Sequence, residues 1–179
     1  TALHAFLEHA DFAALAAAKA SGTLDEAICA ERDRQVAVQL TPPEIAEKLD
    51  VRRIRRFAES DAFARICAAD AVLRELAFIT ALPASAVLAA QGSAAPEGEA
   101  AKASVLVQGI ADIVLIFPDH LELLDYKTDR RKTEADFLAA YRAQLNLYTL
   151  AIDKRFAPKK VTYKGIYSLE LGKLIEVKG

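Results

Sequence analysis

The sequence predicts a mixed α/β fold in which a layer of helices precedes a β-β-β-α-β core. Three observations predict it. Apolar residues recur at helical spacing through residues 1–70, the period then changes to one typical of strands, and a long amphipathic helix separates the last strand-like segments from the earlier ones. The chain of 179 residues has the length of one ordinary domain. We therefore expect a single domain, with a helical part at 1–70 and a core at 71–179.

The helical part is predicted to contain four helices. The first begins near the N-terminus, where apolar side chains recur at helical spacing: Leu3, Phe6, Leu7, Ala10 and Ala14. The run Thr23-Leu24-Asp25-Glu26 is a capping box that starts the second. Thr41-Pro42-Pro43-Glu44 starts the third, which we expect to continue to about Ala58. Ser60 then caps a shorter helix that ends at Ala69.

The core is predicted to open with three strands. Residues 72–79 have the composition of a first strand, and 83–103 are rich in Ala, Ser, Gly, Pro and Glu, which is typical of a long mobile loop. Residues 104–117 and 121–128 then form a hairpin around Pro118-Asp119.

One helix and two strands complete the predicted core. Residues 134–155 form an amphipathic helix, whose apolar stripe consists of Phe137, Tyr141, Leu145, Tyr148 and Ile152. Residues 161–169 and 173–177 are expected to be the closing strands.

Composition excludes several classes of protein. Cys29 and Cys67 are too few for a disulfide framework or an iron–sulfur cluster, which indicates free thiols in a reducing cytoplasm. No apolar run is long enough for a membrane span, and no signal pattern opens the chain. A net charge of −2 leaves only local basic patches for nucleic acid, and the arginine run at 52–56 is expected to be solvated or a docking surface. Because the chain begins with Thr1 and contains no methionine, we expect a piece of a longer polypeptide.

Two acids and a lysine stand out on the predicted hairpin. If its turn has two residues, Phe117 pairs with His120, and Asp112 falls opposite Asp125 about 5 Å away on the same face. Lys127 follows two positions along that face. Like charges so close repel unless a cation lies between them, and carboxylate oxygens suit Mg²⁺ or Mn²⁺. This is the minimal set of groups for metal-dependent phosphodiester hydrolysis.

The residues alone leave an alternative open. Asp125 and Lys127 are ordinary residues for a strand, so they could form a surface ion pair while Asp112 lies in a loop. The register of the hairpin decides between the two readings, since a slip of one residue sends the acids to opposite faces.

Four segments together resemble a known family. Val107–Asp112, Asp125–Asp129, Gln144-Leu145-x-x-Tyr148 and the opening Thr1–Leu7 are similar to the C-terminal nuclease domain of AddA and RecB helicase–nucleases, which belong to the PD-(D/E)XK nuclease superfamily. The resemblance covers nearly the whole chain, in order. It implies a restriction-endonuclease-like fold, with a mixed sheet flanked by helices and an N-terminal helical layer.

The resemblance also implies roles for individual residues. Asp112 and Asp125 would be carboxylate ligands of Mg²⁺ or Mn²⁺, and Tyr126 would add its backbone carbonyl. His4 would complete the metal shell from the first helix. Lys127 would position the attacking water and stabilise charge on the phosphorane.

Further residues are implied as substrate-binding or supporting groups. Gln144 and Tyr148 share a helix face, where they would contact the DNA backbone or support the catalytic lysine. The alternative, in which Tyr148 belongs to the core stripe with Gln144 at its polar edge, stays open. Glu75 would support the site from the first strand, and Arg130 and Arg131 are placed to touch a phosphate backbone.

As a function, the resemblance implies a metal-dependent DNA exonuclease domain of a bacterial, cytoplasmic helicase–nuclease that acts in double-strand break processing and recombinational repair. Its substrate would be single strands emerging from the attached helicase. The rest of the helicase chain and a second, AddB-like subunit would be its partners. This segment contains neither an ATP-binding P-loop nor a four-cysteine cluster, which favours the A-type subunit. A freestanding nuclease for RNA or branched DNA, and a catalytically silent binding module, are the alternatives.

Overall fold

The structure is a computed structural model that describes residues 1–94 and 96–179. The chain divides into two compact units. The first consists of Thr1–Ala69, Tyr126–Arg130 and Tyr167–Leu174, and the second of Asp70–Asp125, Arg131–Ile166 and Ile175–Gly179. Each unit is described by itself below. That the chain acts as one domain stays a prediction.

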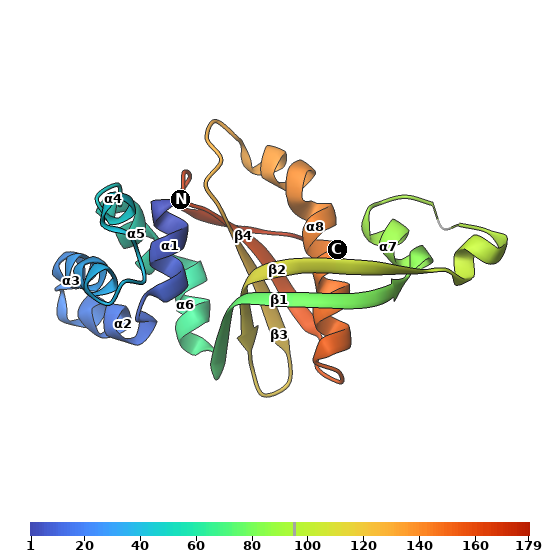
Figure 1. The fold of residues 1–179 in the computed structure, drawn as a ribbon, viewed down its shortest axis with the longest axis horizontal. Helices are drawn as coiled ribbons and strands as arrows, with labels where there is room; N and C mark the ends of the chain where they lie inside the picture. The colour runs from blue at the N-terminus through green and yellow to red at the C-terminus, as the bar shows by residue number, and fades with distance from the viewer. Residues whose placement is uncertain (95) are drawn as a thin grey trace. The chain divides into compact units, whose positions relative to one another are not determined.

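The helices of the first unit all precede Asp70 (Figure 1). They are α1 (Ala2–His9), α2 (Phe12–Ser21), α3 (Leu24–Ala37), α4 (Pro43–Ala46), α5 (Val51–Ala58) and α6 (Asp61–Ala68). Six helices therefore stand, among the residues that are described, where the sequence predicts four.

Carboxylate caps explain the two additional breaks. The predicted first helix is interrupted because the side chain of Asp11 accepts a hydrogen bond from the backbone N–H of Ala14 and starts α2. The predicted third helix is likewise divided, because Asp50 caps α5. Ser60 caps α6 as predicted, whereas the side chain of Thr23 makes no cap hydrogen bond to α3.

Aromatic rings form the centre of the first unit. Phe57 contacts the rings of Phe63, Tyr126 and Tyr167 edge to face, at centroid distances of 5.6, 5.5 and 5.1 Å. Burial of these rings supplies most of the hydrophobic stabilisation that short helices need.

The arginines of α5 are less solvated than the sequence suggests. The guanidinium of Arg53 pairs with Asp50 and with Glu170, and its side chain is only 20% exposed. The side chain of Arg56 lies against Gly172, which takes a positive φ in the turn after the fourth strand. The expectation of a fully solvated patch is therefore wrong for Arg53.

A buried polar network joins α1 to α3. Gln35 donates to the carbonyl of Phe6 at the end of α1 and to the carboxylate of Glu31. Glu31 also accepts from the guanidinium of Arg34 and from the backbone N–H of Asp11. These contacts satisfy backbone groups that a helix end leaves open and hold α1 in place.

The second unit contains most of a five-stranded sheet in the order β1-β2-β3-β4-β5. The strands are β1 (Ala71–Pro83), β2 (Ser104–Ile116), β3 (Leu121–Lys127), β4 (Val161–Ser168) and β5 (Lys173–Glu176). Between them lie the helices α7 (Ala84–Ala90), η1 (Gly98–Lys102) and α8 (Glu134–Arg155). The predicted strands and the long helix are thus confirmed to within a few residues.

The segment predicted as a mobile loop, 83–103, contains α7 and the short helix η1. The loop prediction is wrong for those residues. The reason is that the alanine-rich stretch of α7 has high helix propensity and buries Val87 in the core of the unit.

The connection between β3 and β4 is parallel. Leu121 at the start of β3 donates to the carbonyl of Lys160, and the carbonyl of Lys127 at the end of β3 accepts from Leu169. Both strands therefore run in the same direction, and α8 forms the crossover. Phe137, Leu145 and Ile152 of α8 are fully buried in the core of the unit, as the predicted stripe requires.

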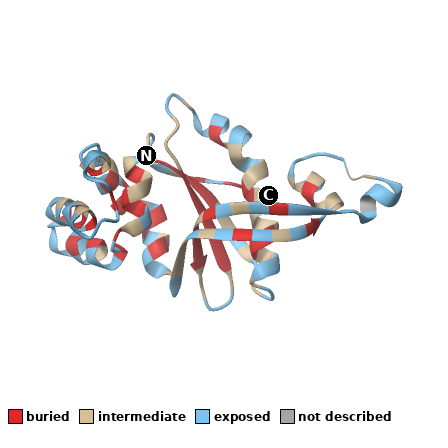
Figure 2. Ribbon diagram, viewed as in Figure 1, coloured by how far each residue is buried: buried red, intermediate tan, exposed pale blue. Residues whose placement is uncertain are grey.

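Strands β1 and β2 form a long antiparallel ribbon whose two faces differ (Figures 1 and 2). One face packs Phe78, Leu82 and Val107 into the core. The other leaves Ile79 and Leu106 exposed, at 65% and 66% of their surface. The backbone carbonyls of Ala77 and Ala81 accept hydrogen bonds from Arg155 and Lys154 at the end of α8.

Candidate active site

The β2–β3 hairpin in the second unit has the predicted register. The backbone N–H of Phe117 donates to the carbonyl of His120 at 3.0 Å, and the pairing continues inward to Ile113 opposite Leu124. One more step in this register sets Asp112 opposite Asp125. Asp125 is buried, with 3% of its surface exposed. The alternative in which Asp112 lies in a loop is excluded, because Asp112 is a residue of β2.

The backbone is distorted beside Asp112. In the β1–β2 ladder Arg74 pairs with Ile113 and Leu76 with Ala111, so that Glu75 and Asp112 are passed over. Glu75 has a φ of 46°, in the left-handed region that a side chain of this size rarely adopts. Such strain persists where the surrounding structure enforces it, and it is frequent at functional sites. Glu75 thus lies across the ribbon from the predicted metal ligand.

Gln144 and Tyr148 lie together on α8, as predicted. The amide of Gln144 donates to the hydroxyl of Tyr148 at 3.1 Å. The ring of Tyr148 packs edge to face on Phe78, with 4.9 Å between centroids, and lies against Gly109. A Cβ atom at position 109 would be 2.9 Å from the Tyr148 ring, so this approach of α8 to β2 requires glycine. The core-stripe reading therefore describes the packing of Tyr148, while a contact with DNA stays a prediction.

In the first unit, His4 of α1 faces the backbone of Tyr126. Its Nε2 lies 3.3 Å from the carbonyl oxygen of Tyr126, and its Nδ1 lies 3.0 Å from the hydroxyl of Thr1. Thr1 also caps α1, so one side chain fixes both the helix start and the orientation of the imidazole. Sequence analysis did not single out Thr1, and its position as a possible N-cap was the only available signal.

The basic residues after β3 differ among themselves. Arg130 and Arg131 are exposed, and Arg131 has a φ of 60°. The ammonium of Lys132 instead lies over the ring of Tyr141, 4.8 Å from its centroid. Arg130 and Arg131 are thus the residues of this cluster that solvent reaches.

The chemistry of these donors fits a hard divalent cation. Two carboxylates, a carbonyl and one imidazole are ligands that Mn²⁺ accepts readily and Mg²⁺ tolerates. Neighbouring ligands of an octahedral ion with bonds of about 2.1 Å lie about 3 Å apart, which is close to the 3.3 Å between His4 Nε2 and the carbonyl oxygen of Tyr126. In the described part of the chain no three His, Cys, Asp or Glu side chains are already gathered as a metal-binding group.

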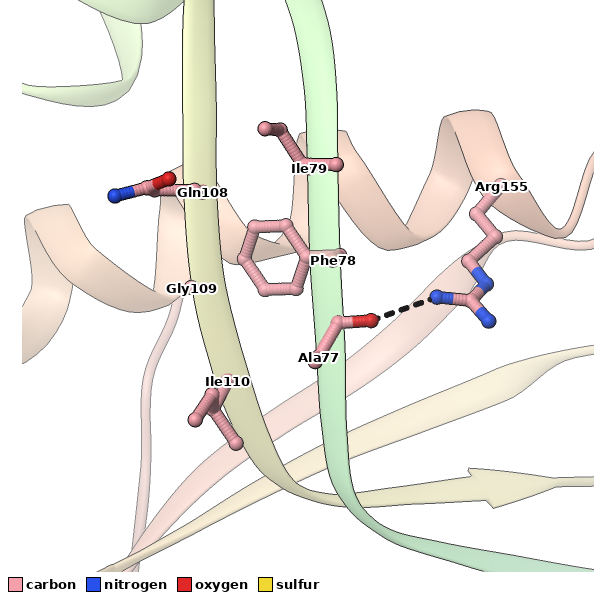
Figure 3. A pocket seen from close by; sticks show the side chains of 7 residues that line it. All are labelled: Ala77, Phe78, Ile79, Gln108, Gly109, Ile110 and Arg155. Carbon is pink, nitrogen blue, oxygen red and sulfur yellow. Dashed lines mark hydrogen bonds between the residues drawn. The ribbon is translucent and has the colours of Figure 1, made fainter.

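A separate hollow lies on the β1–β2 ribbon and includes none of the predicted catalytic residues. It measures about 590 Å³, and Figure 3 shows its lining: Ala77, Phe78, Ile79, Gln108, Gly109, Ile110 and Arg155. The guanidinium of Arg155 is directed to the carbonyl of Ala77 and not into open space. The hollow is apolar and shallow in character, which does not suit a metal site. Among the helices in residues 1–94 and 96–179, none has both the length and the apolar character that a membrane crossing needs.

Comparison with known proteins gives a consistent relationship, in which three relatives are each the A subunit of an ATP-dependent helicase/nuclease. The chain is 35% identical over 157 residues to the relative from Moorella thermoacetica, 33% over 183 residues to that from Heliobacterium modesticaldum, and 33% over 158 residues to that from Ligilactobacillus salivarius. These matches cover 87%, 97% and 85% of the chain but only 10%, 12% and 12% of the relatives. The family model described as the PD-(D/E)XK nuclease superfamily matches residues 1–176. The chain therefore belongs to the PD-(D/E)XK nuclease superfamily.

Proposed function

We propose that this chain is the metal-dependent deoxyribonuclease domain of a bacterial helicase–nuclease, acting on single strands as a helicase delivers them. The observation that carries the proposal is the β2–β3 register, which continues to Asp112 opposite Asp125. The relatives, each named as the A subunit of a helicase/nuclease, support the wider setting. In that setting the protein works in the cytoplasm, in break processing and recombinational repair. Its partners there are the helicase chain and an AddB-like subunit.

Asp112 and Asp125, the carbonyl of Tyr126 and the imidazole of His4 would hold the divalent ion. When bound, Mg²⁺ or Mn²⁺ lowers the pKa of water and offsets charge on phosphate oxygens. The strand pleat puts Lys127 on the same face as Asp125, two residues along.

The ammonium of Lys127 orients a water molecule for in-line attack on phosphorus. It also stabilises the negative charge that grows on the phosphoryl oxygens. The new bond joins the water oxygen to phosphorus, the bond from phosphorus to the 3′ oxygen breaks, and a proton passes to that oxygen. The products carry a 5′ phosphate and a 3′ hydroxyl.

The supporting residues act on the nucleic acid chain. Arg130 and Arg131 are exposed directly after the catalytic strand, where they can bind phosphate groups. Glu75 and Gln144 would support the site from β1 and α8. We propose that the tyrosine hydroxyl bonded to Gln144 fixes the amide for contact with the backbone.

The central test is Asp125→Asn, assayed by cleavage of labelled single-stranded DNA with Mg²⁺. Loss of several kcal/mol of transition-state stabilisation should lower the rate about 10²- to 10³-fold. Asp119→Asn is the matched control, because Asp119 belongs to the same hairpin but its side chain is 85% exposed at the turn. Cleavage by Asp125→Asn at the rate of the wild type contradicts the proposal. Parallel assays on duplex DNA and RNA separate it from a freestanding nuclease of other specificity.

A second test measures the metal directly. His4→Ala should weaken Mn²⁺ binding about tenfold or more, as followed by electron paramagnetic resonance of the bound ion. His9→Ala is the control, since His9 lies on another face of α1, beside Glu8. Equal Mn²⁺ affinity in wild type and His4→Ala would remove His4 from the ligand set. The absence of any Mn²⁺ binding in the wild type would favour a silent binding module.

A further inference from the structure

A basic cluster lies on α8, on a side different from Tyr148. Arg142 and Asn146 are one helical turn apart and line a hollow of about 630 Å³ beside the end of α7. Lys164 of β4 lines a second hollow of about 270 Å³. Gly179 lines both hollows, so they adjoin each other. All of these residues belong to the second unit.

Asn146 connects the two hollows. Its Oδ1 accepts a hydrogen bond from the ammonium of Lys164 at 2.5 Å, and its Nδ2 donates to the carbonyl of Ala90 at 3.3 Å. The amide is therefore held by α7 and in turn holds the lysine. An ammonium fixed in this way has lost much of the side-chain freedom that a surface lysine would have to give up on binding a ligand.

The charges of the cluster are of one sign where it meets α8. Burial lowers the pKa of Lys164, and the positive charge of Arg142 lowers it further, whereas Asp153 acts in the opposite direction. In the portion of the chain that is described, Arg142 makes no ion pair and is the only charged side chain that lines the larger hollow. Glu176 and Lys178 line the smaller hollow and offset each other. Two cations are thus held near each other, which disfavours both charges unless an anion joins them.

The shape of the larger hollow indicates what kind of anion fits. Its remaining lining is made of small or neutral residues: Ala89, Ala90, Gln91, Gly92, Ala135, Leu138, Ala139, Ala143 and Gly179. It offers no aromatic ring on which a base could stack. An arginine fork and a fixed ammonium instead match the oxygens of phosphate groups.

We propose that Arg142 and Lys164 bind the phosphate backbone of a single-stranded polynucleotide, at a site outside the acidic strands. The inference rests on the proposed function only for the choice of nucleic acid as the ligand. Backbone contacts carry no base or sugar information, so the site should bind DNA and RNA strands alike. It would hold the strand while the catalytic residues act elsewhere along it.

The test is binding of a fluorescent 20-nucleotide single strand in EDTA, where no cleavage occurs, between about 50 and 200 mM salt. Arg142→Gln and Lys164→Gln should each lower the affinity several-fold at low salt. Each should also lower the slope of log affinity against log salt by about 0.7, the loss expected for one phosphate contact. Lys102→Gln, which removes one exposed charge paired with Glu99 in the same unit, is the control and should leave the slope unchanged.

Arg142 is exposed, so Arg142→Gln tests the proposal even if Lys164→Gln alters stability. Slopes equal to the wild type in both variants, or an equal loss in Lys102→Gln, overturn it. A loss with DNA but none with RNA also overturns it, because backbone contact would not make that distinction. If Mg²⁺-dependent cleavage is absent while both variants show the smaller slope, the proposed function fails and this binding site stands.

Discussion

Gly109→Ala should destabilise the second unit, because α8 approaches β2 too closely for a methyl group. An added Cβ would lie 2.8 Å from Cζ of Phe78 and 2.9 Å from both Cζ and the hydroxyl oxygen of Tyr148. Neither ring can withdraw freely, since Phe78 is buried and the two rings pack edge to face. The variant must shift an aromatic side chain or move α8 away from the strand.

The cost follows from two opposing effects. Overpacking a core costs about 1–3 kcal/mol. Replacement of glycine within a strand returns about 0.5–1 kcal/mol, because the unfolded chain loses freedom. The net destabilisation is therefore about 1.5 kcal/mol, which shifts a urea midpoint by about 0.7 M if unfolding depends on urea with a slope of about 2 kcal/mol per M.

Urea unfolding followed by circular dichroism measures the effect. Phe78→Leu removes the Cζ atom, so Gly109→Ala should cost at least about 0.5 kcal/mol less in that background. Gln108→Ala, on the exposed outer face of the same strand, should stay within about 0.5 kcal/mol of the wild type. The reasoning is refuted if Gly109→Ala unfolds at the wild-type midpoint, or if its cost is the same with Leu at position 78.

Two further predictions concern the pH dependence of stability. Burial alone would raise the pKa of Glu31, but hydrogen bonds from Arg34 and Gln35 hold that pKa below its usual 4.5. The carboxylate therefore adds stability above about pH 4.5 that is lost as the pH falls, and melting temperatures at about pH 7 and about pH 4 should differ less in Glu31→Gln than in the wild type. Burial raises the pKa of Tyr167 to about 12, so the unfolded chain ionises first and stability should fall between about pH 10 and pH 12. Tyr167→Phe should lose less stability over that range in alkaline denaturation, and an equal loss would show that Tyr167 is not the group responsible.

Local signals predicted the parts of the fold that a few neighbouring residues determine. The turn at Pro118-Asp119 fixed the register of β2 and β3, because loop length sets which residues face each other. The capping box at Thr133 and the apolar stripe that follows it defined α8. Breaks at Asp11 and Asp50 were missed, since apolar spacing continues through both positions while the caps interrupt the backbone.

Tertiary features were beyond the reach of these signals. The left-handed φ of Glu75 and the contact of Gly109 with Tyr148 depend on segments distant in the chain. The approach of His4 to the carbonyl of Tyr126 joins residues 122 positions apart, so only the family resemblance pointed to it. The roles of these residues in catalysis stay predictions that the variants above test.

The outer edge of the β1–β2 ribbon has a consequence for association. Strand β1 ends the sheet order, and an edge strand offers unpaired backbone groups on which another chain can add a strand. Here Arg155 and Lys154 donate to the carbonyls of Ala77 and Ala81, which places two cations along that border. An incoming strand would have to displace both and meet their charge. The ribbon can therefore display Ile79 and Leu106 to solvent without becoming a template for fibrous aggregation.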